Sequence, residues 1–331
     1  MTPTLHPRLL NGRAGDPAVF VEAMHAAGAV LFDCGDLSAL SNGHLLRVQL
    51  LCVSHAHMDH WADFDRLLRP LIGREAVLRV VGPPGFAALL HHRLASYTWN
   101  LVDRIAAPLT FDVVEVTTTP PFPAARLRLQ SGFAREDLAS VTPDAEGTLL
   151  RIGAVGLRAA LLDHRTPSVG YALVEDLHLN VWRTRLAERG LPTGMWLAAL
   201  KQAIADGLPD DAVLATPAGA QPLGALRDLV VATAGQRIAY LTDFGDTPEN
   251  RAAAVALAQG ADTLFIEAPF LAADAEVAAD RMHLTTRAAG EIARAAGARR
   301  LEPMHLSPRY TGRDAEWLAE IEVAFGAPLT P

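Results

Sequence analysis

Seven consecutive residues, Ser54 to His60, carry four side chains of the kind that binds divalent metals. They read Ser-His-Ala-His-Met-Asp-His and directly follow the apolar run 48–53, which predicts a short buried strand. Neutral imidazole and carboxylate are the ligands that zinc and similar ions take. A solvated His-rich loop is the alternative, but this spacing at a strand end favours a metal site. Four donors in one turn cannot all reach a single ion with good geometry, so the pattern suggests two adjacent metals.

Four other predicted strands end in side chains of the same kind. The runs 157–162, 238–242, 263–266 and 299–304 are followed by Asp163-His164, Asp243, Glu267 and His305, respectively. Because open sheets gather their loops at the carboxyl ends of the strands, these residues can converge on the turn at 54–60. Each one alone is weak evidence, since Asp243 can start a turn and Asp246 competes with it as a ligand. Together they predict a metal centre.

Alternating strand-like and helical segments surround these positions. Further strands are expected at 19–21, 29–32, 76–81, 113–116, 125–130 and 148–152, and helices at 63–71, 86–95, 252–259 and 287–296. Residues 176–225 differ, with two short helices at 181–189 and 195–205 and a Pro/Gly/Ala-rich stretch, and we interpret them as an inserted arm or linker. Two strand-rich halves, each with helices, predict an α+β fold, a four-layer αββα sandwich of two mixed sheets in a single domain over 1–331.

The composition indicates a protein without membrane spans. The chain has 331 residues, a net charge of −8 and a single lysine, Lys201. No apolar run approaches about 18 residues, and no signal peptide is visible, so we expect a cytoplasmic protein. The acidic balance is not typical of a nucleic-acid-binding protein, although a local arginine patch would suffice. Cys34 and Cys52 lie in apolar segments and are expected to be buried thiols.

Six motifs along the chain resemble those of a known family. The turn at 54–60 and the segment 31–36 before it match the first part of its pattern. The other four motifs are His164–Tyr171, Ile266–Phe270, His283–Thr286 and His305–Tyr310. On these motifs, which cover nearly the whole chain, the protein resembles the metallo-β-lactamase fold superfamily, and within it the ribonuclease Z (tRNA 3′-processing endonuclease) branch. The last two motifs are specific to that branch.

Two regions depart from that branch. It usually opens with Gly-Thr-Gly and a Pro-x-Lys-Arg-Asn loop, whereas this chain has Leu-Asn-Gly-Arg-Ala-Gly-Asp-Pro at 10–17. The inserted arm of the family, which grips the tRNA elbow, is rich in Gly and Lys, whereas residues 176–215 carry one lysine and several acids. Pro269 also stands where the family has Thr. These departures leave the metal ligands intact, but they are compatible with a substrate other than tRNA.

The resemblance implies a centre of two divalent ions. Its ligands would be His55, His57 and His164 for one ion, Asp59, His60 and His305 for the other, and Asp243 as the bridge. Zinc suits this donor set first, with manganese or iron as alternatives. Two ions about 3.5–4 Å apart lower the pKa of a shared water towards 7 and clamp the attacking and leaving oxygens of a phosphodiester. The bridging hydroxide would be the nucleophile.

Three side chains are candidates for a catalytic role, namely Asp59, Glu267 and His283. His283 lies outside the ligand set and would donate to the leaving or a non-bridging oxygen, with Glu267 orienting its ring. The alternative is that His283 only caps the following helix. Arg309 is the candidate for binding the substrate phosphate, and pairing with a carboxylate is its alternative role.

Three functions are compatible with these residues. The first is a dinuclear-metal phosphodiesterase, an endonuclease that processes precursor tRNA and forms a homodimer as its relatives do. The second is a hydrolase of a small molecule on the same scaffold, acting on a cyclic nucleotide, lactone or thioester. The third is a non-catalytic protein that kept the fold, and the complete set of ligands argues against it.

Overall fold

The computed structural model describes residues 4–23, 28–175 and 177–329, which form two compact units. The larger unit comprises residues 1–174 and 237–331, and the smaller one residues 175–236. The inserted arm that the sequence predicts at 176–225 falls within the smaller unit. Among the helices in the described ranges, none is long and apolar enough to cross a membrane.

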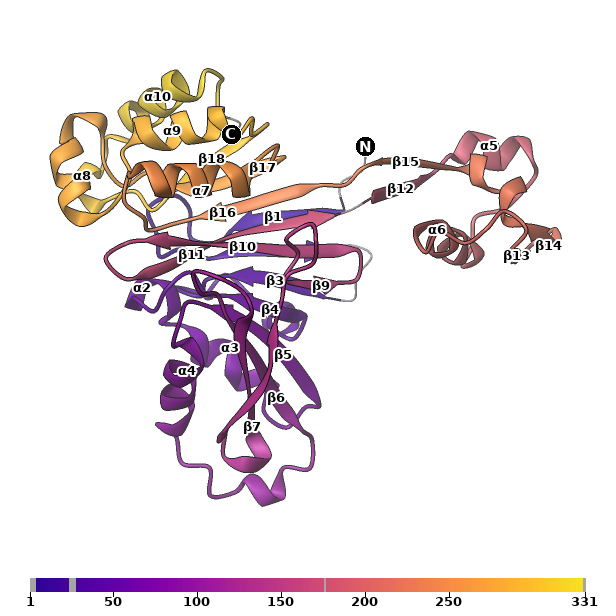
Figure 1. The fold of residues 1–331 in the computed structure, drawn as a ribbon, viewed down its shortest axis with the longest axis horizontal. Coiled ribbons are helices and arrows are strands. Elements are labelled where there is room, and N and C mark those ends of the chain that lie inside the picture. The colour runs from indigo at the N-terminus through magenta and orange to yellow at the C-terminus, as the bar shows by residue number, and fades with distance from the viewer. Residues whose placement is uncertain (1–3, 24–27, 176, 330–331) are drawn as a thin grey trace. The chain divides into compact units, whose positions relative to one another are not determined.

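The first half of the larger unit forms one eight-stranded sheet whose strands follow chain order (Figure 1). They are β1 (Leu5–Leu9), β2 (Val19–Ala23), β3 (Ala29–Phe32), β4 (Val48–Cys52), β5 (Ala76–Gly82), β6 (Leu109–Glu115), β7 (Phe122–Arg128) and β8 (Arg135–Val141). Strands β3 to β6 run parallel, and antiparallel strands flank them on both sides. Parallel strands are buried on both faces, which explains the nearly continuous apolar run of β4.

The second sheet of the larger unit has six strands in the order β18-β17-β16-β11-β10-β9. Their bounds are β9 (Leu150–Ile152), β10 (Val155–Asp163), β11 (Pro167–Glu175), β16 (Arg237–Leu241), β17 (Thr263–Glu267) and β18 (Leu301–Met304). Strands β16, β17 and β18 are parallel to one another, and β11 is antiparallel to β16. This sheet is therefore also mixed.

Helices cover the outer face of each sheet. They are α1 (Asn42–Leu45), α2 (Met58–Trp61), α3 (Phe64–Leu71), α4 (Phe86–Ala95), α7 (Pro248–Ala258), α8 (Ala275–Arg281), α9 (Thr286–Ala295) and α10 (Asp314–Phe325). One apolar cluster joins α3 and α4 to the first sheet, another joins α7, α9 and α10 to the second, and a third lies between the sheets. In the third cluster the rings of Phe32 and Tyr240 stack with centroids 5.2 Å apart. The predicted four-layer αββα sandwich is confirmed.

Several elements carry no clear signal in the sequence. The sequence predicts nothing at β8, because its Arg-Glu-Asp-Leu-Ala-Ser-Val stretch is a largely exposed edge strand without apolar alternation. Helices α8 and α10 and strand β11 are also unpredicted, and β6 begins at Leu109 instead of residue 113. Short 3₁₀ helices fill the connections: η1 (Val102–Arg104), η2 (Leu129–Ser131), η3 (Leu223–Ala225), η4 (Arg227–Leu229), η5 (Ala272–Asp274) and η6 (Pro308–Tyr310).

The smaller unit has its own apolar cluster. Its elements are β12 (Leu177–Val181), α5 (Arg183–Glu188), α6 (Trp196–Ala205), β13 (Val213–Thr216), β14 (Gly219–Pro222) and β15 (Val230–Ala234). The buried residues include Leu186, Leu200 and Leu229. Strands β12 and β15 pair as an antiparallel ribbon, and the two expected helices are present with slightly shorter bounds.

Candidate metal centre

The candidate ligands and Glu267 lie at or just after the carboxyl ends of five strands. Strand β4 belongs to the first sheet and leads into the turn that carries His55, His57, Asp59 and His60. Strands β10, β16, β17 and β18 belong to the second sheet and lead to the other candidates. Helix α2 begins at Met58 within the turn, which places Asp59 and His60 on a helical backbone. The two sheets thus contribute to one site.

One group of four donors consists of His55, His57, His164 and Asp243. Their candidate ligand atoms all lie within 4.8 Å of one another. Nε2 of His55 and Nε2 of His164 each lie 3.6 Å from Oδ2 of Asp243. Three of the four residues are buried and His57 is exposed, so this group is open to solvent beside His57.

A second group consists of Asp59, His60 and His305. Nε2 of His60 lies 3.5 Å and Nε2 of His305 lies 3.2 Å from Oδ2 of Asp59. Asp243 also contacts this group, with Oδ2 at 3.4 Å from Nε2 of His60 and Oδ1 at 3.1 Å from Nδ1 of His305. Asp243 is therefore positioned between the two groups. Its competitor in the sequence, Asp246, instead forms an ion pair with Arg251.

The hydrogen bonding of the cluster fits divalent metals. Five buried side-chain atoms lack a hydrogen-bond partner in the part of the chain that the structure describes. Three of them belong to the cluster: Nε2 of His55, Nε2 of His60 and Nδ1 of His305. Because a buried polar atom without a partner is costly, their concentration at one point indicates that they face a ligand. Nitrogen and carboxylate oxygen are the donors that zinc takes.

Outer contacts hold three imidazole rings so that Nε2 faces the cluster. Nδ1 of His60 lies 2.8 Å from Oδ2 of Asp33, and Nδ1 of His164 lies 2.8 Å from the carbonyl oxygen of Met282. Nδ1 of His55 lies 3.1 Å from the hydroxyl of Ser54. Such contacts fix the tautomer and orientation of a metal-binding histidine.

Asp33 is the centre of these outer contacts and is fully buried. Besides His60, it accepts hydrogen bonds from the backbone N–H and the hydroxyl of Ser54, both at 2.7 Å, and from the hydroxyl of Tyr240 at 2.6 Å. From the sequence we expect Asp33 only as a supporting or turn residue. No sequence signal marks Tyr240, because its strand reads like any buried strand.

The backbone is strained where these residues follow their strands. Asp33, Asp243 and His305 have φ values of 51°, 49° and 63°, in the left-handed region that residues other than glycine rarely adopt. Met282, whose carbonyl orients His164, has a φ of 56°. Strained backbone of this kind concentrates at functional sites, where the surrounding structure enforces it.

The N-terminal loop at 10–17 packs against the second group. The backbone N–H of Leu306 donates to the carbonyl of Arg13 at 2.8 Å. A Cβ added to Gly35 would lie 1.9 Å from the carbonyl oxygen of Asp59 and 2.7 Å from Cβ of Asp16, so only glycine fits there. Burial and the nearby Asp59 raise the pKa of Asp16. The loop thus brings an additional acid to this side of the centre.

The electrostatics of the cluster differ from one donor to the next. Burial, and then His60, lower the pKa of His55 to about 2. Burial opposes ionisation of Asp243, but His305 and His60 outweigh it and hold its pKa well below the usual value. Burial lowers the pKa of His60, whereas the carboxylates of Asp243 and Asp33 raise it well above the usual value. A cation bound here would replace that proton.

Glu267 and His283 form a pair beside both groups. Nδ1 of His283 lies 2.7 Å from Oε2 of the fully buried Glu267, whose Oε1 accepts from the N–H of Phe244 at 3.0 Å. The ring centroid of His283 lies 4.7 Å from that of His164 and 5.6 Å from that of His305. Burial lowers the pKa of His283, but Glu267 raises it above the usual value. Thr285, not His283, caps α9 with its side chain.

Arg309 lies on η6 and contacts a different carboxylate. Its Nη1 lies 3.6 Å from Oδ1 of Asp274, and its side chain is 45% exposed. This contact matches the alternative role expected from the sequence, and phosphate binding by Arg309 stays a prediction.

Comparison with known proteins places the chain in a family. Residues 216–306 match the family described as "Beta-lactamase superfamily domain". The chain is 34% identical over 325 residues to a protein of Deinococcus radiodurans named Ribonuclease Z, which covers 97% of this chain and 95% of that protein. This similarity extends over both units.

Two solved structures share the fold. The metallo-β-lactamase fold protein YhfI from Bacillus subtilis has a TM-score of 0.56 and 14% identity, covering 97% of this chain and 93% of that one. The short form of human tRNase Z has a TM-score of 0.54 and 20% identity, covering 92% of each chain. Both confirm the predicted metallo-β-lactamase fold. With its clustered histidines and aspartates, the chain is a metal-dependent hydrolase and belongs to the ribonuclease Z family.

Proposed function

We propose that this protein is a dinuclear-metal phosphodiesterase that cleaves RNA, with precursor tRNA as the substrate. The observation that carries the proposal is the position of Asp243 between two groups of ligands, with the His283–Glu267 pair beside them. The name of the relative from Deinococcus radiodurans, Ribonuclease Z, supports RNA as the substrate. Cleavage of a phosphodiester requires mainly positioning and stabilisation of charge, which such a site offers.

The donor set favours two zinc ions, with manganese or iron as alternatives. His55, His57 and His164 would hold one ion, Asp59, His60 and His305 the other, and Asp243 would touch both. When bound, two such ions supply Lewis acidity to the phosphoryl oxygens and lower the pKa of a water.

The residues of the chain supply orientation and proton transfer. Glu267 accepts the hydrogen bond from Nδ1 of His283, which fixes the ring and leaves Nε2 to deliver a proton to the leaving oxygen. Asp59, whose side chain is 40% exposed, is open to solvent and accepts a hydrogen bond from the attacking water. The buried Asp33 holds His60 directly and His55 through the hydroxyl of Ser54.

Two observations favour a small-molecule hydrolase as the second candidate. Asp16 lies next to Asp59, where the family carries a basic loop. In the smaller unit, Asp228 pairs with both Arg185 and Arg189, and Asp210 pairs with Arg227, so two carboxylates offset part of the charge of these three arginines. Both features weaken the attraction of a polyanion.

A substrate comparison tests the proposal. Purified protein, with its metals counted by elemental analysis, is given precursor tRNA with a 3′ trailer, a chromogenic phosphodiester, a cyclic nucleotide and a lactone. We expect about two ions per chain and cleavage of the RNA at the 3′ end of the tRNA body. Turnover of only the small substrates would favour the second candidate, and turnover of none with zinc or manganese present would contradict both.

A homodimer is part of the proposal and rests on the resemblance to ribonuclease Z. Light scattering of the purified protein measures its mass directly. A mass of one chain at micromolar concentration would exclude the dimer without affecting the proposed reaction.

A further inference from the structure

The loops that carry Glu267 and His283 are joined to each other. Glu267 ends β17 and is followed by the loop at 268–274, and His283 lies between α8 and α9. The backbone N–H of Thr286 donates to the carbonyl of Phe270 at 2.7 Å, and Phe270 and Thr285 form an isolated parallel bridge. A shift of either loop would therefore change how Glu267 meets His283.

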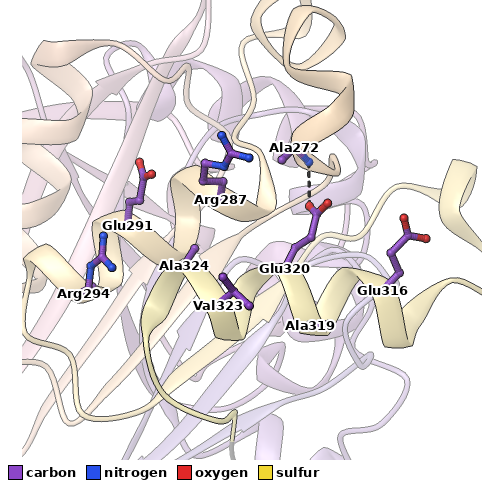
Figure 2. Close-up of a pocket in the computed structure, with 9 residues that line it drawn as sticks. All are labelled: Ala272, Arg287, Glu291, Arg294, Glu316, Ala319, Glu320, Val323 and Ala324. Carbon is purple, nitrogen blue, oxygen red and sulfur yellow. Dashed lines mark hydrogen bonds between the residues drawn. The ribbon is translucent and has the colours of Figure 1, made fainter.

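One carboxylate oxygen from α10 holds both loops. Oε2 of Glu320 accepts from the backbone N–H of Ala272 at 2.9 Å and from the hydroxyl of Thr286 at 2.5 Å. Thr286 is fully buried and Glu320 is partly buried. Figure 2 shows the side chain of Glu320 directed at the backbone of Ala272. Both contacts go to a carboxylate oxygen, and hydrogen bonds to a charged acceptor are stronger than bonds between neutral groups.

Helix α10 is a firm support for this contact. A Cβ added to Gly290 of α9 would lie 2.6 Å from Cβ of Ala324, so the two helices are in close contact there. The indole N–H of the fully buried Trp317 donates to the carbonyl of Ala268 at 2.6 Å, one residue after Glu267. The position of Glu320 is therefore fixed by packing that does not involve the metal ligands.

Glu320 also lines a groove of about 510 Å³ between α9 and α10. Arg287, Glu291 and Glu316 are among the other lining residues (Figure 2). Because this groove is open on one side of Glu320, water can occupy the space that a smaller side chain leaves. Replacement of Glu320 is therefore compatible with a folded protein.

We propose that Glu320 is a positioning residue that sets the geometry of the Glu267–His283 pair through Ala272 and Thr286. This inference rests on the proposed function, in which His283 delivers a proton. Glu320 touches neither substrate nor metal, and it acts only by fixing the positions of the two loops relative to each other. Its removal should slow the chemical step and leave metal binding and substrate affinity unchanged, since the ligands lie on other strand ends.

Three variants test the proposal. In E320A both hydrogen bonds are lost, and we expect kcat to fall by roughly tenfold to a hundredfold, with KM and the number of bound zinc ions unchanged. In E320Q we expect kcat within about threefold of the wild type, because both bonds go to one oxygen and an amide oxygen has two lone pairs. The control is E316Q, which changes a carboxylate one turn away that pairs with Arg313. It should behave as the wild type.

Two kinetic outcomes would overturn the proposal. The first is a kcat of E320A within about twofold of the wild type, since the two loops would then keep their relative positions without Glu320. The second is a kcat of E320Q as low as that of E320A, because the charge of Glu320 rather than its contacts would then matter.

A spectroscopic readout separates this inference from the proposed reaction. Nuclear magnetic resonance detects the Nδ1–H proton of His283 as a downfield signal when Glu267 accepts it. We expect this signal in the wild type and in E316Q, and its loss in E320A, whether or not RNA is cleaved. An unchanged signal in E320A would overturn the inference. Absence of cleavage by the wild type would instead count against the proposed function alone.

Discussion

The ion pairs of the two units of this protein differ in their exposure to solvent. At the metal centre, His60 and Asp33 are fully buried and joined by a hydrogen bond of 2.8 Å. In the smaller unit, Arg185 and Asp228 pair with side chains that are 38% and 40% exposed. A buried network is costly to disturb, whereas exposed pairs are screened by salt and contribute little to stability. The centre therefore tolerates few substitutions, and the charge of the smaller unit can change without loss of the fold.

Asp243→Ala should have the largest effect, because this carboxylate contacts both ligand groups. We expect activity to fall on the order of a thousandfold, with fewer than two ions retained per chain. Elemental analysis and phosphodiester turnover measure the two effects. The matched control is Asp246→Ala, which removes only the ion pair with Arg251. Equal loss of metal in both variants would contradict the placement of Asp243.

His283→Ala separates proton transfer from metal binding. We expect kcat to fall by about a hundredfold or more, with both ions retained, because His283 contacts Glu267 and lies outside the two proposed ligand groups. The control is His92→Ala, an exposed histidine on α4. A variant that loses metal together with activity would show that His283 is a ligand instead.

Asp33→Asn tests how far the buried network controls the centre. The amide keeps the shape but removes the charge that faces Nδ1 of His60. We expect zinc affinity to fall by roughly tenfold to a hundredfold in competition with a chelator. Asp36→Asn is the control, because that partly buried carboxylate accepts a turn contact from Ser38. Unchanged affinity in the Asp33 variant would mean that the metal ligands are held by the backbone alone.

Among these variants, Asp228→Asn should change the free energy of unfolding least. It tests whether RNA binds to the smaller unit. Loss of its pairs with Arg185 and Arg189 should cost no more than about 1 kcal/mol. If RNA contacts this unit, its affinity should rise and the salt dependence should steepen by roughly one unit of slope per added phosphate contact. Asp103→Asn removes the same charge outside the unit. Identical binding in both variants would argue against RNA contact by the smaller unit.

Much of the metal centre is predictable because its residues follow apolar strands. The turn at 54–60 concentrates four donors. Asp243 and His305 directly follow the strand-like runs 238–242 and 299–304, and His164 lies one residue beyond the run 157–162. Because the carboxyl ends of the strands meet at one edge of a sheet, residues that are far apart in the sequence come close together there. The same logic predicts the αββα sandwich, because its buried strands have continuous apolar sequences.

Other features depend on contacts that the sequence does not show. Asp243 and Asp246 both follow β16, and only their contacts in the fold separate their roles, since Asp243 faces the histidines and Asp246 pairs with Arg251. The hydroxyl of Tyr240 reaches Asp33 from a residue 207 positions away. The exposed edge strand β8 has no apolar periodicity, so the sequence pattern gives no signal for a strand there. Long-range pairing and exposed edges are therefore the parts of this fold that the sequence leaves open.

The metal ligands come from both sheets, and this has a consequence for assembly. His55 and His60 follow a strand of the first sheet, whereas His164, Asp243 and His305 follow strands of the second. Neither half of the larger unit holds a complete ligand set, so ions of the proposed centre bind tightly only after the halves have docked. Their binding energy would then add to the free energy that keeps the halves together. Loss of the metal ions would therefore weaken the contact between the two sheets.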